Sequence, residues 1–190
     1  MRMGIESEKM RAFSSLLSSQ GPSLGLIGPK EAQRVWERHI ENCAVLAPFI
    51  EKIGAKSVVD VGSGAGLPGV VLAILLPSVS FTLLEPRALR KSWLDRMKKE
   101  LELENAQVFK LKAEQWKGEK FDAAVCRALA PLSALPPLLS PLVKSGGWVF
   151  ALKGKKAAEE VKDVPGSQLC GVKQEDGEET FVASFPVRRR

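Results

Sequence analysis

One stretch near the middle of the chain limits its fold more than any other. An apolar segment runs into Asp60, and the glycines Gly62, Gly64 and Gly66 follow at once. A buried strand that ends in a glycine-rich turn is typical of α/β proteins that bind nucleosides, because glycine lets the backbone come close to a ligand. The next strand ends in Glu85, whose carboxylate can accept hydrogen bonds from both hydroxyls of a ribose. The sequence therefore predicts a nucleoside-containing cofactor at the ends of these two strands.

Two cofactors compete for this pattern. The distance from Gly66 to Glu85 is 85 − 66 = 19 residues, close to the spacing of about 20 in dinucleotide-binding folds. A G-x-G-x-x-G match also exists, but it starts at Gly64, four residues after the strand ends at Asp60, and Leu67 replaces the third glycine when the pattern is read from the strand end. An acid at the strand tip repels a pyrophosphate and suits a cationic amino-acid group. We therefore expect S-adenosyl-L-methionine in preference to NAD; a glycine turn without a ligand is the remaining alternative.

Length and composition restrict the class of protein. The 190 residues suffice for one α/β domain, and 45% hydrophobic with 26% charged residues is an ordinary soluble balance. No apolar run reaches the roughly 18 residues that span a bilayer, and residues 1–11 lack an apolar signal core, so we expect neither a membrane partner nor secretion. The net charge of +6 favours a polyanionic partner.

The cysteines and the histidine do not suggest a metal site. Cys43, Cys126 and Cys170 have no C-x-x-C spacing, and His39 is the only histidine of the chain. We expect no metal, free thiols and a cytoplasmic location. Cys126 is expected to pack at a strand end and not to act as a nucleophile. His39 is expected to be a packed helix residue.

Strands and helices are expected to alternate along most of the chain. Strands are predicted over 57–61, 80–84, 107–111, 121–126 and 147–152, with a closing hairpin of 168–174 and 180–185 around residues 175–178. Helices are predicted over 31–49, 67–76, 87–103, 132–143 and 155–161. This order resembles the class I S-adenosylmethionine-dependent methyltransferase fold, a Rossmann-like α/β fold with a mostly parallel seven-stranded sheet and a C-terminal antiparallel hairpin. We expect a single domain over 1–190 with an N-terminal helical extension over 1–50.

Several segments together resemble one family, RsmG or GidB, the guanine-N7 methyltransferases of small-subunit 16S ribosomal RNA. Residues 60–69 resemble its D-x-G-t-G-a-G-L-P-G run, and residues 81–85 resemble F-T-L-L-D with Glu85 for Asp. Further similar runs are Arg38-His39-Ile40, Phe121-Asp122 with Cys126-Arg127-Ala128-Leu129-Ala130, and Ala151-Leu152-Lys153-Gly154. The resemblance covers roughly residues 31 to 185. It departs at Gly177-Glu178-Glu179-Thr180, where the family reads G-E-R-H, and this reverses charge near the face expected to meet RNA.

The resemblance implies a reaction, and the residues suggest how it proceeds. It implies methylation of guanine N7, and cofactor contacts at Gly62, Leu67, Ala113, Glu114 and Arg127. The strand-and-turn pattern itself adds Asp60, Gly64, Gly66 and Glu85 to this set. Guanine N7 carries a lone pair and no proton, so the protein needs to supply alignment and no general base.

Arg127, at the end of the fourth strand, is the residue expected to be catalytic, by orienting guanine O6 or a phosphate; the alternative is a surface or salt-bridged arginine. Arg38, Arg90 and Lys153 are expected to bind RNA as part of a basic rim around the pocket. We expect 16S ribosomal RNA or the small subunit as partner, and a monomeric enzyme. Two other functions remain open: methylation of a small molecule or protein, and cofactor binding without catalysis.

Overall fold

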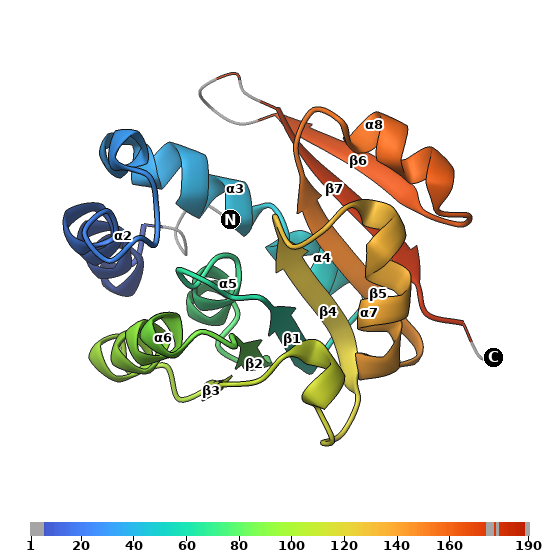
Figure 1. The fold of residues 1–190 in the computed structure, drawn as a ribbon, viewed down its shortest axis with the longest axis horizontal. Helices are drawn as coiled ribbons and strands as arrows, with labels where there is room; N and C mark the ends of the chain where they lie inside the picture. The colour runs from blue at the N-terminus through green and yellow to red at the C-terminus, as the bar shows by residue number, and fades with distance from the viewer. Residues whose placement is uncertain (1–5, 174–176, 178, 189–190) are drawn as a thin grey trace.

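The chain folds around one seven-stranded sheet. The computed structural model describes residues 6–173, 177 and 179–188. Its strands are β1 Ser57–Val61, β2 Ser80–Leu84, β3 Ala106–Phe109, β4 Phe121–Arg127, β5 Val143–Lys153, β6 Gln168–Lys173 and β7 Glu179–Pro186, in the spatial order β3-β2-β1-β4-β5-β7-β6 (Figure 1). The pairs from β3 to β5 are parallel, and β5–β7 and β6–β7 are antiparallel. The predicted fold class, including the closing hairpin, is confirmed.

The sheet separates two hydrophobic cores. Alternation along β1 directs Val58 into one core and Val59 and Val61 into the other. The first core contains α2 Glu8–Gln20, η2 Trp36–Glu41, α3 Asn42–Ala44, α4 Ala47–Lys52, α5 Gly69–Leu75 and α6 Ala88–Glu100, and η1 Pro29–Arg34 packs against α2. The second core lies under the short helices η3 Ala113–Gln115, η4 Leu132–Ala134, α7 Leu135–Leu139, η5 Ser140–Leu142, α8 Ala157–Glu160 and η6 Val161–Asp163. The strand order reverses at β1 and β4, which is where open α/β sheets bind ligands beyond the carboxyl ends of their strands.

The N-terminal region differs from the single helix predicted over 31–49. The chain forms the 3₁₀-helix η1, the π-helix η2, the short α3 and then α4. Pro48 lies in the first turn of α4, where its missing N–H is tolerated, whereas a continuous helix would lose a hydrogen bond there. α2, which the sequence did not indicate as a separate helix, is capped by Ser7 and buries Met10, Phe13 and Leu17.

Prolines also account for the second large difference. The helix predicted over 132–143 is divided into η4, α7 and η5, and Pro141 lies in the first turn of the last of these. β5 begins earlier than predicted, at Val143, and α5 begins at Gly69 because residues 62–68 are used by the glycine turn. The turn of the hairpin, apart from Gly177, and the tail residues 189–190 lie outside the described residues.

Candidate active site

The glycine turn after β1 has one open position and one packed position. Gly64 and Gly66 have φ angles of +55° and +97°, which L side chains rarely adopt. A Cβ at Gly66 would lie 2.7 Å from Val70 Cγ2, so this glycine permits close packing on α5. A Cβ at Gly64 would meet no atom nearer than 3.7 Å. Gly64 is therefore the position at which the turn presents bare backbone to an approaching ligand.

Glu85 is held in place by the backbone around it. Its side chain is buried, and its two carboxylate oxygens accept hydrogen bonds from the Gly64 N–H (3.0 Å) and the Arg87 N–H (2.9 Å). The Gly62 N–H donates to the Leu84 carbonyl (2.9 Å) and so attaches the turn to the end of β2. An ionised carboxylate has about four acceptor sites, so two backbone donors leave room for two ribose hydroxyls.

Asp60 has a different immediate environment from the one that the sequence suggested. Its side chain is fully buried, and Oδ2 accepts a hydrogen bond from the Gly69 N–H at 2.9 Å, at the start of α5. Oδ1 is also buried and has no hydrogen-bond partner among the described residues. Burial raises the pKa of Asp60 to about 7, and the nearby Glu85 adds to this rise. Asp60 thus holds the start of α5 through the Gly69 N–H. Its direct contact with a ligand stays a prediction.

The remaining predicted cofactor residues lie on the neighbouring loops. Leu67 is mostly buried at the end of the glycine turn. Ala113 is buried and Glu114 is exposed on η3, which follows β3. Glu114 is therefore accessible near the carboxyl end of β3. This position is compatible with a contact to the adenine amino group, which stays a prediction.

Arg127, at the end of β4, points toward the N-terminal segment. Its Nη2 donates to the Arg38 carbonyl at 3.3 Å and lies 2.8 Å from Nδ1 of His39. Its Nη1 donates to Cys43 Sγ at 3.6 Å. These three partners lie 84 to 89 residues away in sequence, on η2 and α3. Arg127 is thus a junction between the sheet and the extension, and its contact with cofactor and substrate stays a prediction.

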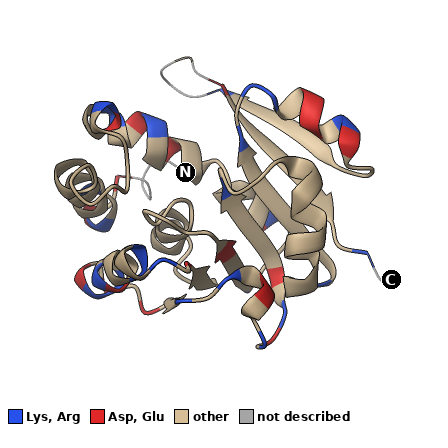
Figure 2. Ribbon diagram, in the orientation of Figure 1, with Lys and Arg blue, Asp and Glu red and all other residues tan. Residues whose placement is uncertain are grey.

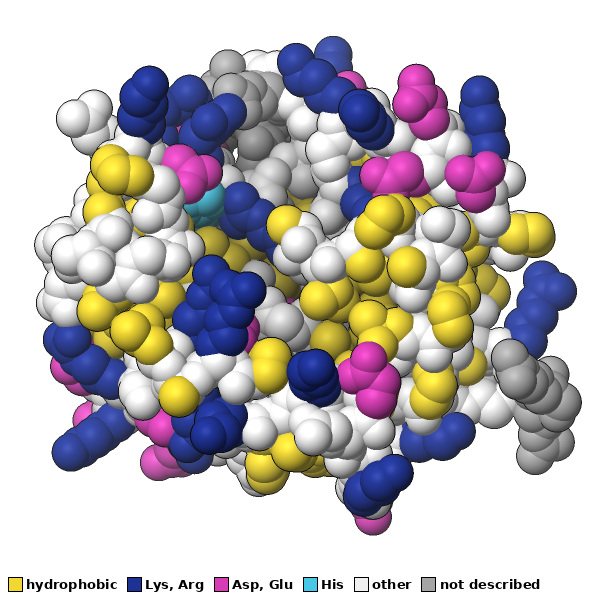
Figure 3. Space-filling model, viewed as in Figure 1, with side chains coloured by type: hydrophobic (Ala, Val, Ile, Leu, Met, Phe, Trp, Pro, Cys, Tyr) yellow, Lys and Arg dark blue, Asp and Glu magenta, His cyan; other side chains and the backbone are white. Residues whose placement is uncertain are grey.

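The three residues expected to bind RNA differ in their surroundings. Lys153 Nζ donates to the Ala130 carbonyl and to Glu160 Oε2, each at 2.7 Å, and its side chain is only 11% exposed. Arg90 extends to the glycine turn, with Nη1 3.8 Å from the position of a Cβ on Gly64. Arg38 lies on η2. Lysines and arginines lie on α6 and on the segment before β1, which pack on the same side of the sheet (Figure 2), and the molecule is hollowed near the centre of this view (Figure 3).

The sequence reading missed several residues that shape this edge. Leu129 covers Gly62, and a Cβ there would lie 2.9 Å from Leu129 Cδ1. Ala128 has a φ angle of +50°, an unusual conformation for a residue with a side chain. The Asn42 side-chain amide donates to the hydroxyl of Thr180, which is buried where the family pattern has histidine. Thr180 was indicated by its departure from the family pattern, and Ala128 and Leu129 belong to the similar run 126–130, whereas Asn42 had no signal in the sequence.

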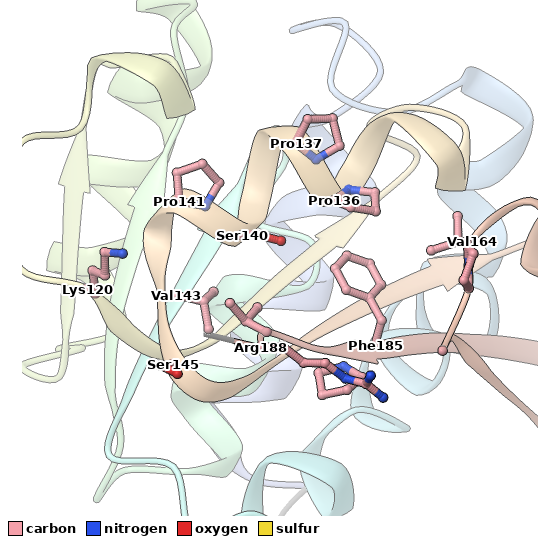
Figure 4. Close-up of a pocket in the computed structure, with 14 residues that line it drawn as sticks. Lys120, Pro136, Pro137, Ser140, Pro141, Val143, Ser145, Val164, Phe185 and Arg188 are labelled. Carbon is pink, nitrogen blue, oxygen red and sulfur yellow. The ribbon is translucent and has the colours of Figure 1, made fainter. Parts of the chain in front are cut away.

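Two grooves lie away from this edge. One, of about 890 Å³, is lined by Pro136, Pro137 and Phe185 among others, between α7 and the end of β7 (Figure 4). It also includes Lys120 and Val143, which stand at the amino ends of β4 and β5. A second groove, of about 950 Å³, lies between α5 and the end of α6. Neither contains a residue predicted to hold cofactor or RNA.

The residues at the carboxyl edge fit S-adenosylmethionine. Three features match a nucleoside: a bare backbone position at Gly64, a preorganised buried carboxylate with free acceptor sites at Glu85, and an exposed carboxylate at Glu114.

Burial raises the pKa of the Cys126 thiol to about 12, so this cysteine stays protonated at neutral pH. In the described part of the chain no three His, Cys, Asp or Glu side chains gather as a metal site would require, and no helix there is long and apolar enough to span a membrane.

The sheet order and this site define a class I methyltransferase fold, and solved structures agree. A putative O-methyltransferase from Klebsiella pneumoniae superposes with a TM-score of 0.63 at 12% identity, over 93% of this chain and 90% of that one. A tRNA methyltransferase from Aquifex aeolicus superposes with a TM-score of 0.61 at 14% identity, over 78% of this chain and 69% of that one.

The chain belongs to the GidB family, described as rRNA small subunit methyltransferase G, whose model matches residues 6–182. Relatives carrying the name ribosomal RNA small subunit methyltransferase G include those of Clavibacter sepedonicus (44% identity over 84% of this chain and 74% of the relative) and Leifsonia xyli (45%, 94% and 78%). The relative from Thermobifida fusca is 46% identical over 80% of this chain. The matched region spans 63% of that relative's length.

Proposed function

We propose that this protein uses S-adenosylmethionine to methylate guanine N7 in 16S ribosomal RNA of the small subunit. The family match over residues 6–182, together with the bare turn at Gly64 beside the fixed carboxylate of Glu85, is the observation that carries this proposal. We also propose that the chain acts as a cytoplasmic monomer, with one domain over 1–190 and a helical extension over 1–50. The net charge of +6 supports an RNA partner.

The chain's own residues have a limited chemical task in this reaction. The bound cofactor supplies an electrophilic methyl group on a sulfonium. Guanine N7 has a free lone pair and no proton to lose, so no general base is needed, and the protonated Cys126 thiol is not required as a nucleophile. Gly62, Gly64 and Glu85 hold the nucleoside, and Glu114 meets its adenine. Arg127 aligns the guanine, and positioning of this kind accounts for the rate enhancement.

The decisive experiment follows a labelled methyl group. The protein is incubated with labelled S-adenosylmethionine and either free 16S ribosomal RNA or small subunits from cells that lack the enzyme, and the modified base is mapped. We expect label on one guanine N7 with the wild type and none with Gly64→Val. Label on protein or on a small molecule, or on no acceptor, would overturn the proposal.

RNA docking has its own test. Each phosphate contact adds about −0.9 or −0.7 to the slope of log affinity against log salt for duplex or single-stranded segments. We expect the double variant Arg38→Gln, Arg90→Gln to flatten this slope and to reduce methylation. Lys153→Gln belongs in a separate variant because it also breaks the ion pair with Glu160. Lys162→Gln, on η6, serves as a control for loss of a positive charge.

A further inference from the structure

We propose that His39 is a positioning residue: in its neutral form it accepts a hydrogen bond from Arg127 and thereby fixes the guanidinium at the end of β4. Where it concerns turnover, this inference rests on the proposed function. The family resemblance assigns no role to this histidine, and the sequence alone predicts a packed helix residue. The reasons lie in the direction of one hydrogen bond, in the surroundings of the ring and in the local helix geometry.

The direction of the hydrogen bond fixes the tautomer of the ring. Arg127 Nη2 lies 2.8 Å from His39 Nδ1, and a guanidinium can only donate. Nδ1 must therefore carry a lone pair, and the proton of the neutral imidazole resides on Nε2. A doubly protonated ring would present an N–H to the guanidinium and would lose this hydrogen bond.

The other side of the ring faces a carboxylate that is itself anchored. Nε2 is buried, has no hydrogen-bond partner among the described residues, and lies 3.8 Å from Glu31 Oε1. Glu31 Oε2 accepts a hydrogen bond of 2.7 Å from the Gly28 N–H. This carboxylate therefore favours the tautomer with the proton on Nε2. The order Glu31–His39–Arg127 holds the imidazole in one tautomer and one orientation, which a side chain that only fills space does not need.

The helix around His39 has an uncommon form. Residues Trp36–Glu41 form a π-helix, a geometry that is rare and often found at functional sites. Within it the consecutive residues His39 and Ile40 are both buried, and the carbonyl of Arg38 accepts a hydrogen bond from Arg127. The π turn thus presents a ring nitrogen and a carbonyl to the same guanidinium.

Charges from each packed element act on the ring. Burial and the Arg127 charge from β4 lower the pKa of His39, whereas Glu31 from η1 raises it and Arg38 of its own helix lowers it. The neighbouring thiol of Cys43 stays neutral, since burial raises its pKa to about 11. The net direction favours the neutral ring that the hydrogen bond requires.

The chain allows a direct spectroscopic test, because His39 is its only histidine. Labelling with ¹⁵N-histidine gives signals from a single imidazole. We expect the Nε2–H tautomer and a titration below the ordinary value of 6.5 in the wild type. Arg127→Gln should move the titration upward, because it removes a positive charge. An Nδ1–H tautomer, or an unchanged titration in Arg127→Gln, would overturn the inference whether or not the protein methylates RNA.

Kinetics test the consequence for turnover. His39→Leu should lower kcat about tenfold or more with little change in cofactor Kd, because Arg127 loses an acceptor while the glycine turn is untouched. His39→Asn, whose Oδ1 can replace Nδ1 as acceptor, should restore most of this loss. The wild type should lose activity at acid pH as the ring becomes doubly protonated and its hydrogen bond to Arg127 is lost, and His39→Asn should not show this decline. Glu31→Gln should move the histidine titration downward, whereas Glu104→Gln, an exposed carboxylate at the opposite edge, should not.

Circular dichroism and thermal melting separate loss of fold from loss of positioning. Equal kcat in a folded His39→Leu variant, or no rescue by His39→Asn at equal stability, would overturn the inference. If His39→Leu fails to fold, the inference is tested by the tautomer of the wild-type ring and by the pH dependence of activity in His39→Asn. A wild type that transfers no methyl group to RNA would contradict the proposed function, and the spectroscopic result would still decide how His39 and Arg127 interact.

Discussion

The two halves of the carboxyl edge of the sheet are held together in different ways. On the β1–β2 side, Glu85 binds backbone N–H groups only 2 and 21 residues away. On the β4 side, Arg127 binds groups 84 to 89 residues away on the extension. The half proposed to hold the cofactor is therefore built from neighbouring segments of chain, whereas the half proposed to meet the substrate depends on a distant one. Changes in the extension should affect turnover and leave cofactor affinity nearly constant.

The largest expected effect comes from Gly64→Val, which should abolish cofactor binding. The free protein has space for the added Cβ, so the loss comes from blocking the ligand, together with a backbone strain of about 1–2 kcal/mol. Isothermal titration should detect no binding, and the melting temperature should fall by only a few degrees. In the contrasting variant Gly66→Val the side chain meets Val70, so the fold itself should be destabilised. Normal cofactor binding by Gly64→Val would place the ligand elsewhere.

Arg127→Ala should reduce kcat about a hundredfold and change cofactor Kd much less. The reason is that misplacing the acceptor base loses alignment without removing the groups that hold the nucleoside. Single-turnover methylation of RNA and cofactor titration measure the two effects separately. A parallel loss in both would show that the two halves of the edge are not independent.

Glu85→Ala should weaken cofactor binding about tenfold or more, because charge-assisted hydrogen bonds contribute about 1.5–3 kcal/mol each. It should also loosen the turn, since the Gly64 N–H loses its acceptor. The measurement is the dissociation constant of the cofactor. Glu114→Ala, which removes another carboxylate at the same edge, is measured for comparison. An unchanged constant for Glu85→Ala would contradict the assigned ribose contact.

The smallest effect on activity is expected from Asp122, at the amino end of β4. Burial alone would raise its pKa, but hydrogen bonds from Lys144 and from the N–H groups of Lys56 and Ser57 hold the pKa at about 2. Because the pKa is below its unfolded value, the stabilisation is present above about pH 4 and is lost as pH falls toward 2. Asp122→Asn should lower the melting temperature at neutral pH, lose this acid dependence and keep wild-type kinetics.

Local patterns predicted that the glycine turn and Glu85 lie together; their contact with the cofactor stays a prediction. The turn at residues 62–66 and the acid at Glu85 follow from glycine and charge placement within one strand–helix–strand unit, and the structure brings them together. The partners of Arg127 could not be read in this way, because they depend on how η2 packs across the end of β4. Asp60 was placed at the correct strand end, but its burial is a consequence of how α5 begins above it.

The predicted helix boundaries were wrong where the hydrophobic pattern does not distinguish one type of helix from another. An apolar stripe looks similar in an α-helix and in a π-helix over a few residues, so η2 was interpreted as part of a regular helix. The segment 132–143 was predicted as one helix, yet Pro141 near its end lies in the first turn of a separate 3₁₀-helix. The second outcome follows from proline, which lacks the N–H that a continuous helix needs.

The hydrogen bond between Asn42 and Thr180 also has a consequence for how the protein matures. The two residues are 138 positions apart, so the bond forms only after nearly the whole chain has left the ribosome. Contacts of such long separation close slowly, because the entropy of a large loop must be lost first. The glycine turn and Glu85 are complete more than 90 residues earlier. A nascent chain can thus form the glycine turn well before the hydrogen bond that joins α3 to β7.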